Sequence, residues 1–130
     1  MIAFDLDGTL VDSRIDLVNS VNALRLGSRE APMDFETSWR DVCKGMPHLY
    51  ATCFPKSMQE DPQLPSRFEA AYLERIFQNT SIYDGIEHVL SKVAKRASLA
   101  VVTNKPQLAT ERLLERAGLR TYFDVIVGGD

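Results

Sequence analysis

The sequence is poor in cysteine: Cys43 and Cys53 are the only two among 130 residues. Two cysteines cannot form the disulfide framework of a small secreted domain, so we expect reduced thiols and a cytoplasmic protein. No apolar run approaches the roughly 20 residues that a membrane helix needs. No basic segment precedes the apolar residues 1–4, as it would in a signal peptide. We therefore expect neither a membrane protein nor a secreted one.

An excess of basic charge is also missing. The chain has 15 basic and 18 acidic residues, for a net charge of −3. Because bulk attraction to nucleic acid or to an anionic membrane needs positive charge, we expect neither as a partner. The 45% hydrophobic and 25% charged residues are typical of a globular domain and exclude a disordered chain.

The C-terminal part of the chain alternates between strand and helix patterns. Apolar runs at 1–6, 99–103 and 123–127 predict buried strands, the last two rich in β-branched residues. A capping box of Asp84 and Glu87 predicts a helix start, and a second helix is expected from Pro106 to a left-handed cap at Gly118. This alternation predicts an α/β fold with parallel strands.

The segment between residues 13 and 80 shows no strand pattern. Its apolar spacing predicts helices over about 13–26, 34–43, 47–54 and 66–78, the last opened by a capping box of Ser66 and Glu69. We therefore expect two domains: an α/β core of residues 1–13 and 80–130, and an all-helical domain of residues 14–79 inserted after the first strand.

The densest chemical signal is the acidic stretch after the first strand. Asp5 and Asp7 are two residues apart, so in an extended segment both point to one face, at the strand end where open α/β sheets bind ligands. Gly8 lets the backbone turn and approach a ligand closely. Two adjacent carboxylates favour a bound Mg²⁺. The alternatives are a plain polar turn or a calcium loop, although Gly8 comes too early for the latter and a third acidic ligand is missing.

Two motifs resemble signatures of the haloacid dehalogenase superfamily. Residues 4–13, FDLDGTLVDS, resemble its first signature, and residues 101–106, VVTNKP, resemble its second. The helical insertion is similar to the cap of the subfamily that includes phosphoglycolate phosphatase and β-phosphoglucomutase. The resemblance implies a doubly wound, Rossmann-like parallel sheet, here truncated, with a helical cap.

The resemblance also implies roles for single residues. Asp5 matches the nucleophile and Asp7 the general acid/base, and both would hold Mg²⁺. Thr103 and Asn104, with Gly8, would bind the phosphate. The alternative, which would carry more weight without the first motif, is that Thr103 is the N-cap of the helix that starts near Pro106.

A Lys-Gly pair in the insertion is similar to the substrate-reading loop of the β-phosphoglucomutase relatives. Lys44 would meet an anionic group of the substrate, and His48 would add a polar contact. The alternative is a solvated lysine beside Gly45, where a helix stops.

The chain lacks two elements that the family pattern requires. A third-motif lysine and the further aspartates of the metal site would lie beyond Asp130, and Lys105 belongs to the second signature and is not expected to replace that lysine. The sequence would then be a piece of a longer protein, a chain that borrows strands from a partner, or a non-catalytic relic. If the protein ends at residue 130, self-association through the exposed edge of the first strand is expected.

The resulting expectation is a Mg²⁺-dependent phosphatase that hydrolyses a small phosphorylated metabolite through an aspartyl-phosphate. Phosphoglycolate is the favoured substrate. The alternatives are a catalytically incompetent member of the family that acts as a binding or assembly module, and a phosphomutase.

Overall fold

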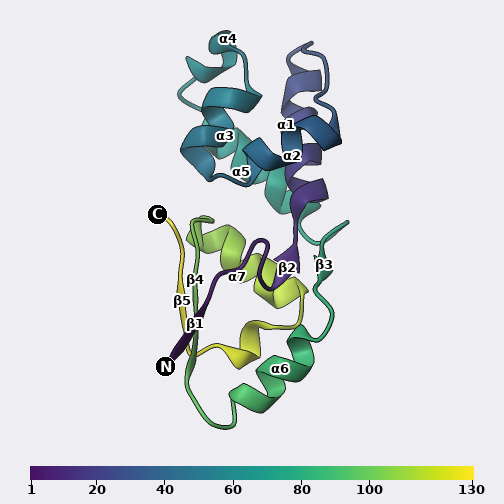
Figure 1. Ribbon diagram of the computed structural model, residues 1–130. Coiled ribbons are helices and arrows are strands. Elements are labelled where there is room, and N and C mark those ends of the chain that lie inside the picture. Colours follow the sequence, from purple (N-terminus) through teal and green to yellow (C-terminus); the bar gives the residue numbers. More distant parts are fainter. The chain divides into compact units, whose positions relative to one another are not determined.

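The computed structural model describes all 130 residues, Met1–Asp130, and the chain divides into two compact units (Figure 1). We call residues 1–13 with 80–130 the α/β unit, and residues 14–79 the helical unit. None of the helices has the length and apolar character that crossing a bilayer would require.

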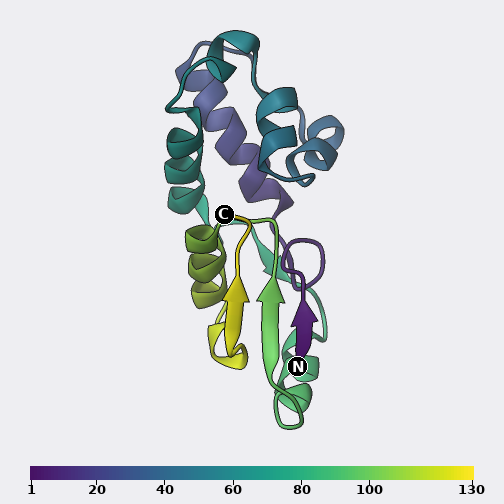
Figure 2. The same cartoon turned by 90° about the vertical axis from the view of Figure 1, so that its left-hand side faces the viewer.

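A three-stranded parallel sheet forms the centre of the α/β unit. Its strands are β1 (Ile2–Phe4), β4 (Leu99–Val102) and β5 (Val125–Val127), in the order β1-β4-β5, so β1 is an edge strand (Figure 2). The register pairs Phe4 with Val101, and Val101 with Ile126. All three strands were predicted, and the parallel α/β class is confirmed. The prediction that all three are buried is wrong for β1 and β5, where Ile2, Val125 and Val127 are exposed, because each is an edge strand with a neighbour on one side only. The carboxyl ends of β1 and β4 lie side by side, and both motifs follow directly from them.

Two helices connect the strands and lie on the same side of the sheet (Figures 1 and 2). They are α6 (Ile86–Val93), which leads into β4, and α7 (Gln107–Arg116), which follows β4 and precedes β5. The core contains fully buried leucines of both helices and of the central strand β4: Leu90 of α6, Leu113 and Leu114 of α7, and Leu99 of β4. On strands β4 and β5, by contrast, Val102, Val125 and Val127 are 50%, 39% and 46% exposed. The apolar surface of the sheet is therefore covered unevenly.

The predicted start of α6 at a capping box of Asp84 and Glu87 is wrong, because a turn precedes the helix. The N–H of Ile86 donates to the Tyr83 carbonyl, and Gly85 has a φ of +84°, so the helix begins only at Ile86 and no side chain caps it. Pro106 likewise precedes α7 instead of being its first residue. The left-handed cap at Gly118 is confirmed, with a φ of +71° and Leu119 fully buried behind it.

A two-stranded antiparallel ribbon joins the ends of the two segments that lead to and from the helical unit. β2 (Val11–Asp12) pairs with β3 (Ser81–Ile82), and the N–H of Tyr83 donates to the carbonyl of Leu10. The ribbon was not predicted, since two-residue strands are too short to show an alternating pattern. It ties the acidic loop to residues 81–83.

The helical unit contains five helices. They are α1 (Arg14–Gly27), α2 (Phe35–Val42), α3 (Met46–Cys53), α4 (Lys56–Gln59) and α5 (Leu64–Arg75). Four were predicted, and the single turn of α4 was not. The predicted capping box at Ser66 is wrong because α5 begins at Leu64: Pro65 occupies its first turn, where a missing N–H loses no bond, and the Ser66 hydroxyl donates to the Gln63 carbonyl.

Aromatic rings dominate the interior of the helical unit. Tyr50, Phe54, Phe68 and Tyr72 form a continuous cluster, with neighbouring ring centroids 6.0 to 6.4 Å apart. At the base of the unit the buried Asp16 carboxylate accepts hydrogen bonds from the Asn79 backbone N–H, at 2.9 Å, and side-chain amide, at 3.0 Å. This clasp joins the first turn of α1 to the residue that ends the unit.

Candidate active site

The acidic loop after β1 is anchored by its apolar residues. Leu6, Leu10 and Val11 are fully buried, and the Leu6 carbonyl accepts hydrogen bonds from the N–H groups of Thr9, Leu10 and Val11. Gly8 has a φ of +79°, which favours glycine, and its N–H donates to the Val11 carbonyl at 2.9 Å. Gly8 therefore shapes the turn, and its N–H is used within the loop.

The two carboxylates of this loop differ in their surroundings. Asp5 is exposed, and its Oδ1 accepts a hydrogen bond from the Leu6 N–H at 2.7 Å. Both oxygens of Asp7 have partners: Oδ1 accepts from the Ser13 hydroxyl at 2.5 Å, and Oδ2 lies 3.1 Å from Lys105 Nζ. Asp5 is thus the accessible carboxylate and Asp7 the anchored one.

The second motif forms the loop between β4 and α7. Thr103 is buried; its N–H donates to the Val127 carbonyl at 3.0 Å, and its Oγ1 accepts from the Lys105 N–H at 3.3 Å. Asn104 is exposed. Thr103 is not the N-cap of the next helix, because Pro106 occupies that position, so the structural alternative for Thr103 is wrong.

The direct link between the two loops is Lys105, which sequence reasoning set aside as part of the second signature. Its side chain is only 2% exposed and its ammonium pairs with Asp7. The available signal was its spacing, since Lys105 follows Thr103 by two residues at a strand end adjacent to β1. Spacing alone does not show which way a long side chain turns.

The donor set of the site is limited to oxygen atoms of two acidic residues. No group of three or more His, Cys, Asp and Glu side chains is gathered to hold a metal ion. Asp5 and Asp7 still fit Mg²⁺ as a partial set, because Mg²⁺ takes few protein ligands and keeps water and substrate phosphate around it.

The two residues predicted to contact substrate from the insertion lie together in the helical unit. Lys44 Nζ and His48 Nε2 both contact Asp41 Oδ1, at 3.0 and 2.9 Å, on either side of Gly45, whose φ is +100°. The hydrogen bonds from His48 and Lys44 lower the pKa of Asp41. Asp41 was not among the predicted residues, although its spacing to Lys44 is that of neighbours on a helix.

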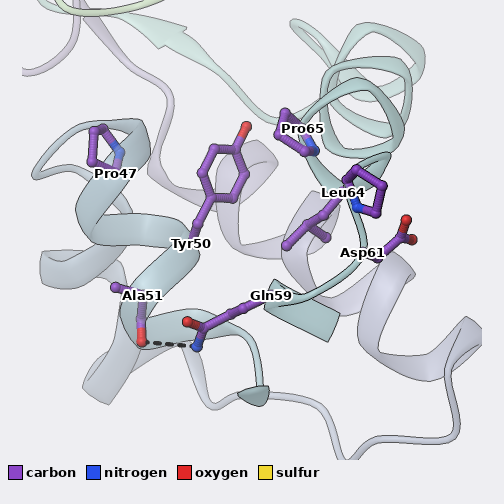
Figure 3. A pocket seen from close by; sticks show the side chains of 8 residues that line it. Pro47, Tyr50, Ala51, Gln59, Asp61, Leu64 and Pro65 are labelled. Atoms are coloured by element: carbon purple, nitrogen blue, oxygen red, sulfur yellow. Dashed lines mark hydrogen bonds between the residues drawn. The ribbon is translucent and has the colours of Figure 1, made fainter. Parts of the chain in front are cut away.

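The helical unit also contains a pocket of about 380 Å³ (Figure 3). Its wall consists of Pro47, Tyr50, Ala51, Gln59, Asp61, Pro62, Leu64 and Pro65. Gln59 Nε2 donates to the Ala51 carbonyl across one side, and Asp61 is occupied by the Gln63 N–H and by Arg67. None of the predicted site residues lines this pocket.

These observations define the class of the protein, which is an α/β protein with a candidate site at the carboxyl ends of two neighbouring parallel strands. A parallel, Rossmann-like sheet carries Asp5 and Asp7 at the end of one strand, and the Thr-Asn-Lys loop at the end of the neighbouring strand contacts Asp7 through Lys105. The particular family follows from comparison. The model of the haloacid dehalogenase-like hydrolase family matches residues 2–130, and the chain belongs to that family.

Individual relatives share most of this chain. A phosphoglycolate phosphatase from Chromobacterium violaceum is 37% identical over 136 residues, which cover 99% of this chain and 61% of the relative. One from Caulobacter vibrioides is 34% identical, covering 99% and 57%. The crystal structure of a predicted phosphoglycolate phosphatase from Haemophilus somnus superposes with a TM-score of 0.88 at 25% identity, covering 100% and 62%. The chain spans about three fifths of the length of these relatives.

Proposed function

We propose that the protein is a phosphatase that hydrolyses a small phosphorylated metabolite through an aspartyl-phosphate on Asp5. The observation that carries the proposal is the difference between the two carboxylates: Asp5 is exposed, while Asp7, two residues on, has a partner for each oxygen. A nucleophile must reach the substrate, whereas an acid/base residue must be held in one place.

The reaction takes two steps. A carboxylate oxygen of Asp5 attacks phosphorus, the bond from phosphorus to the alcohol oxygen breaks, and Asp7 gives that oxygen a proton. Asp7, now a carboxylate, then accepts a proton from a water molecule whose oxygen attacks the phosphorus of the aspartyl-phosphate. The bond between phosphorus and Asp5 breaks, which restores the Asp5 carboxylate and releases inorganic phosphate.

Charge must be balanced where an anionic carboxylate meets an anionic phosphate. Mg²⁺ held by the Asp5 carboxylate and the Asp7 main-chain carbonyl would offset the negative charge. In the second motif, the Thr103 hydroxyl and the Asn104 N–H are proposed to hold phosphoryl oxygens, and Gly8 allows the close approach. The exposed position of Asn104 and the location of Thr103 at the end of β4 support this assignment.

Phosphoglycolate is the proposed substrate, since relatives 37% and 34% identical to this chain carry that name. Its carboxylate requires a cationic partner, and we assign that role to Lys44 with His48. Lys44 is 56% exposed along its side chain and His48 37%, and an ammonium bonded to Asp41 keeps further N–H groups for a ligand.

The test is Mg²⁺-dependent phosphate release from phosphoglycolate, beside a panel of other phosphorylated metabolites. We expect turnover that Asp5→Asn abolishes, and a larger KM in Lys44→Met with a nearly unchanged kcat. If neither the 130-residue chain nor a longer protein containing it turns over any phosphate ester, the enzyme proposal fails and a binding or assembly role takes its place. Transfer of the phosphoryl group to a second sugar hydroxyl instead of water would identify a phosphomutase.

A further inference from the structure

Lys105 differs from the residues that would touch substrate in being buried. Its side chain is 2% exposed, whereas the Asp7 side chain that it contacts is 24% exposed. A substrate phosphate approaching the loop from solvent therefore meets Asp7 before Lys105. The Lys105 ammonium lies 3.1 Å from Asp7 Oδ2, whereas the Ser13 hydroxyl donates to the other oxygen, Asp7 Oδ1.

We propose that Lys105 is a positioning residue that, together with Ser13, holds the Asp7 carboxylate in a single orientation for its acid/base role. The proposal rests on the function proposed above for Asp7. Each oxygen has its own partner from a different part of the chain, so rotation of the carboxylate would break one or both contacts. A group held in its productive orientation does not lose that freedom again during the reaction.

The backbone that carries Lys105 is itself fixed by the segment after β5. The Lys105 carbonyl accepts a hydrogen bond from the Gly129 N–H at 2.9 Å, and the Thr110 hydroxyl donates to the same oxygen at 3.2 Å. A Cβ added at Gly129 would lie 2.4 Å from the carbonyl oxygen of Asn104, so the two backbones are in close contact. A residue held this firmly is suited to position another one.

Two neighbouring contacts add to these. We call the contacts of residues 128–130 with residues 104–107 the brace. The Gly128 N–H donates to the Gln107 side chain at 2.6 Å, and the Gln107 N–H donates to Asp130 Oδ1 at 2.7 Å. The start of α7 is thereby fastened to residues 128–130. Residues 128–130 follow β5, so they contact the loop after β4 from the side opposite to β1. Lys105 in turn contacts Asp7 after β1.

The direct test measures the orientation of Asp7 without requiring turnover. Three-bond couplings from Asp7 Cγ to its backbone N and C′ report χ1, and we expect one rotamer in the wild type. Lys105→Met keeps the length of the side chain and removes its charge. Because the loss of one partner of a buried ion pair is destabilising, the folding of this variant is checked first. We expect averaged couplings in Lys105→Met, a single rotamer in Lys105→Arg, and no change in Lys95→Met, which replaces an exposed lysine of the same unit.

A reciprocal measurement covers the case in which Lys105→Met does not fold. In the wild type the buried Lys105 ammonium should give a slowly exchanging NMR signal, and Asp7→Asn should broaden or remove it. If Asp7 keeps a single rotamer in folded Lys105→Met, or if the ammonium signal is unchanged in Asp7→Asn, Lys105 does not position Asp7. Loss of the rotamer in Ser13→Ala alone would assign the role to Ser13.

The kinetic consequence is expected to depend on the leaving group. In single-turnover formation of the aspartyl-phosphate, Lys105→Met should lose about 10²-fold on phosphoglycolate, which needs a proton on its leaving oxygen. On p-nitrophenyl phosphate, whose leaving group needs no acid, the loss should be less than about tenfold, and KM should change little for both. A rise in KM alone, or equal losses on both esters, would overturn the proposal. If the wild type turns over neither ester, the proposed function fails, while the couplings still decide whether Lys105 orients Asp7.

Discussion

The two units of the molecule are stabilised in different ways. The helical unit encloses its apolar side chains: Phe68, Leu49 and Cys53 are at most 2% exposed, and only Ile15 and Leu26 of its large apolar residues are exposed. The α/β unit leaves far more apolar surface open, including Ile2 on its edge strand and the valines of β4 and β5. A continuous aromatic core thus belongs to the unit that carries no predicted catalytic residue.

The proposed site residues of the two units also differ in the number of polar contacts that hold them. In the α/β unit, hydrogen bonds and one buried ion pair fix Asp7, Lys105 and the loop around them at several points. In the helical unit the predicted substrate residues share one half-buried partner, Asp41. The residues of the proposed chemistry are thus held by several polar contacts each, whereas the proposed substrate residues of the insertion share one partner. Elsewhere in the helical unit the buried Asp16 is also fixed by hydrogen bonds, to Asn79.

The largest expected effect comes from opening the aromatic cluster. Phe68→Ala removes the ring that contacts Tyr50, Phe54 and Tyr72, and should cost about 3–5 kcal/mol of unfolding free energy in the helical unit. Leu26→Ala, at a 59% exposed position of the same unit, should change it by less than about 0.5 kcal/mol. Urea unfolding followed by NMR gives both values. If the signals of Asp7 and Thr103 melt together with those of α5, the units are not independent.

A smaller effect is expected from the brace behind the second motif. In Gly129→Ala the new Cβ would collide with the Asn104 carbonyl, so the loop must shift, at a cost of about 1–3 kcal/mol. Gly27→Ala is the matched change in the helical unit, where a Cβ meets nothing within 4 Å, and it should be neutral or slightly stabilising. Thermal unfolding compares the two, and chemical shifts of Thr103 to Lys105 report the displacement. An unshifted loop in Gly129→Ala would show that the contact does not hold it.

The smallest effect is expected on the stability of the helical unit at acidic pH. The two carboxylates whose pKa values are lowered, Asp41 by His48 and Lys44 and Asp61 by the Gln63 N–H and Arg67, both lie in the helical unit. A folded-state pKa below the usual 3.8 means that the stability from Asp41 is present above pH 3.8 and is lost as the pH falls through the lowered value. The difference in Tm between wild type and Asp41→Asn should therefore shrink between pH 5 and pH 2.5. A constant difference across this range would contradict the assignment.

The sequence predicts the elements of this molecule better than it predicts their contacts. The three strands follow from apolar runs, and Gly118 ends α7 as its spacing indicates, because these signals are local. The capping boxes at Asp84 and Ser66 failed because a glycine turn and a proline decided where the helices begin. A cap requires a backbone geometry that residue types alone do not specify.

The candidate site shows the same division. Asp5, Asp7 and Thr103 were found because they follow strands in recognisable motifs. The contacts of Lys105 with Asp7 and of Asp41 with Lys44 and His48 were not predicted, since both depend on the directions of long side chains. The Gly129 contact behind the second motif joins residues far apart in sequence, which no local pattern could reveal.

The role of Asp5 as the nucleophile can be tested by trapping the phosphorylated protein and locating the phosphate. A longer protein containing this chain, incubated with Mg²⁺ and phosphoglycolate and quenched in acid, would be reduced with borohydride and analysed by mass spectrometry. We expect conversion of Asp5 to homoserine, which requires an acyl phosphate at that carboxylate, and no conversion in Asp5→Asn. Phosphate on another residue, or turnover that persists in Asp5→Asn, would contradict it.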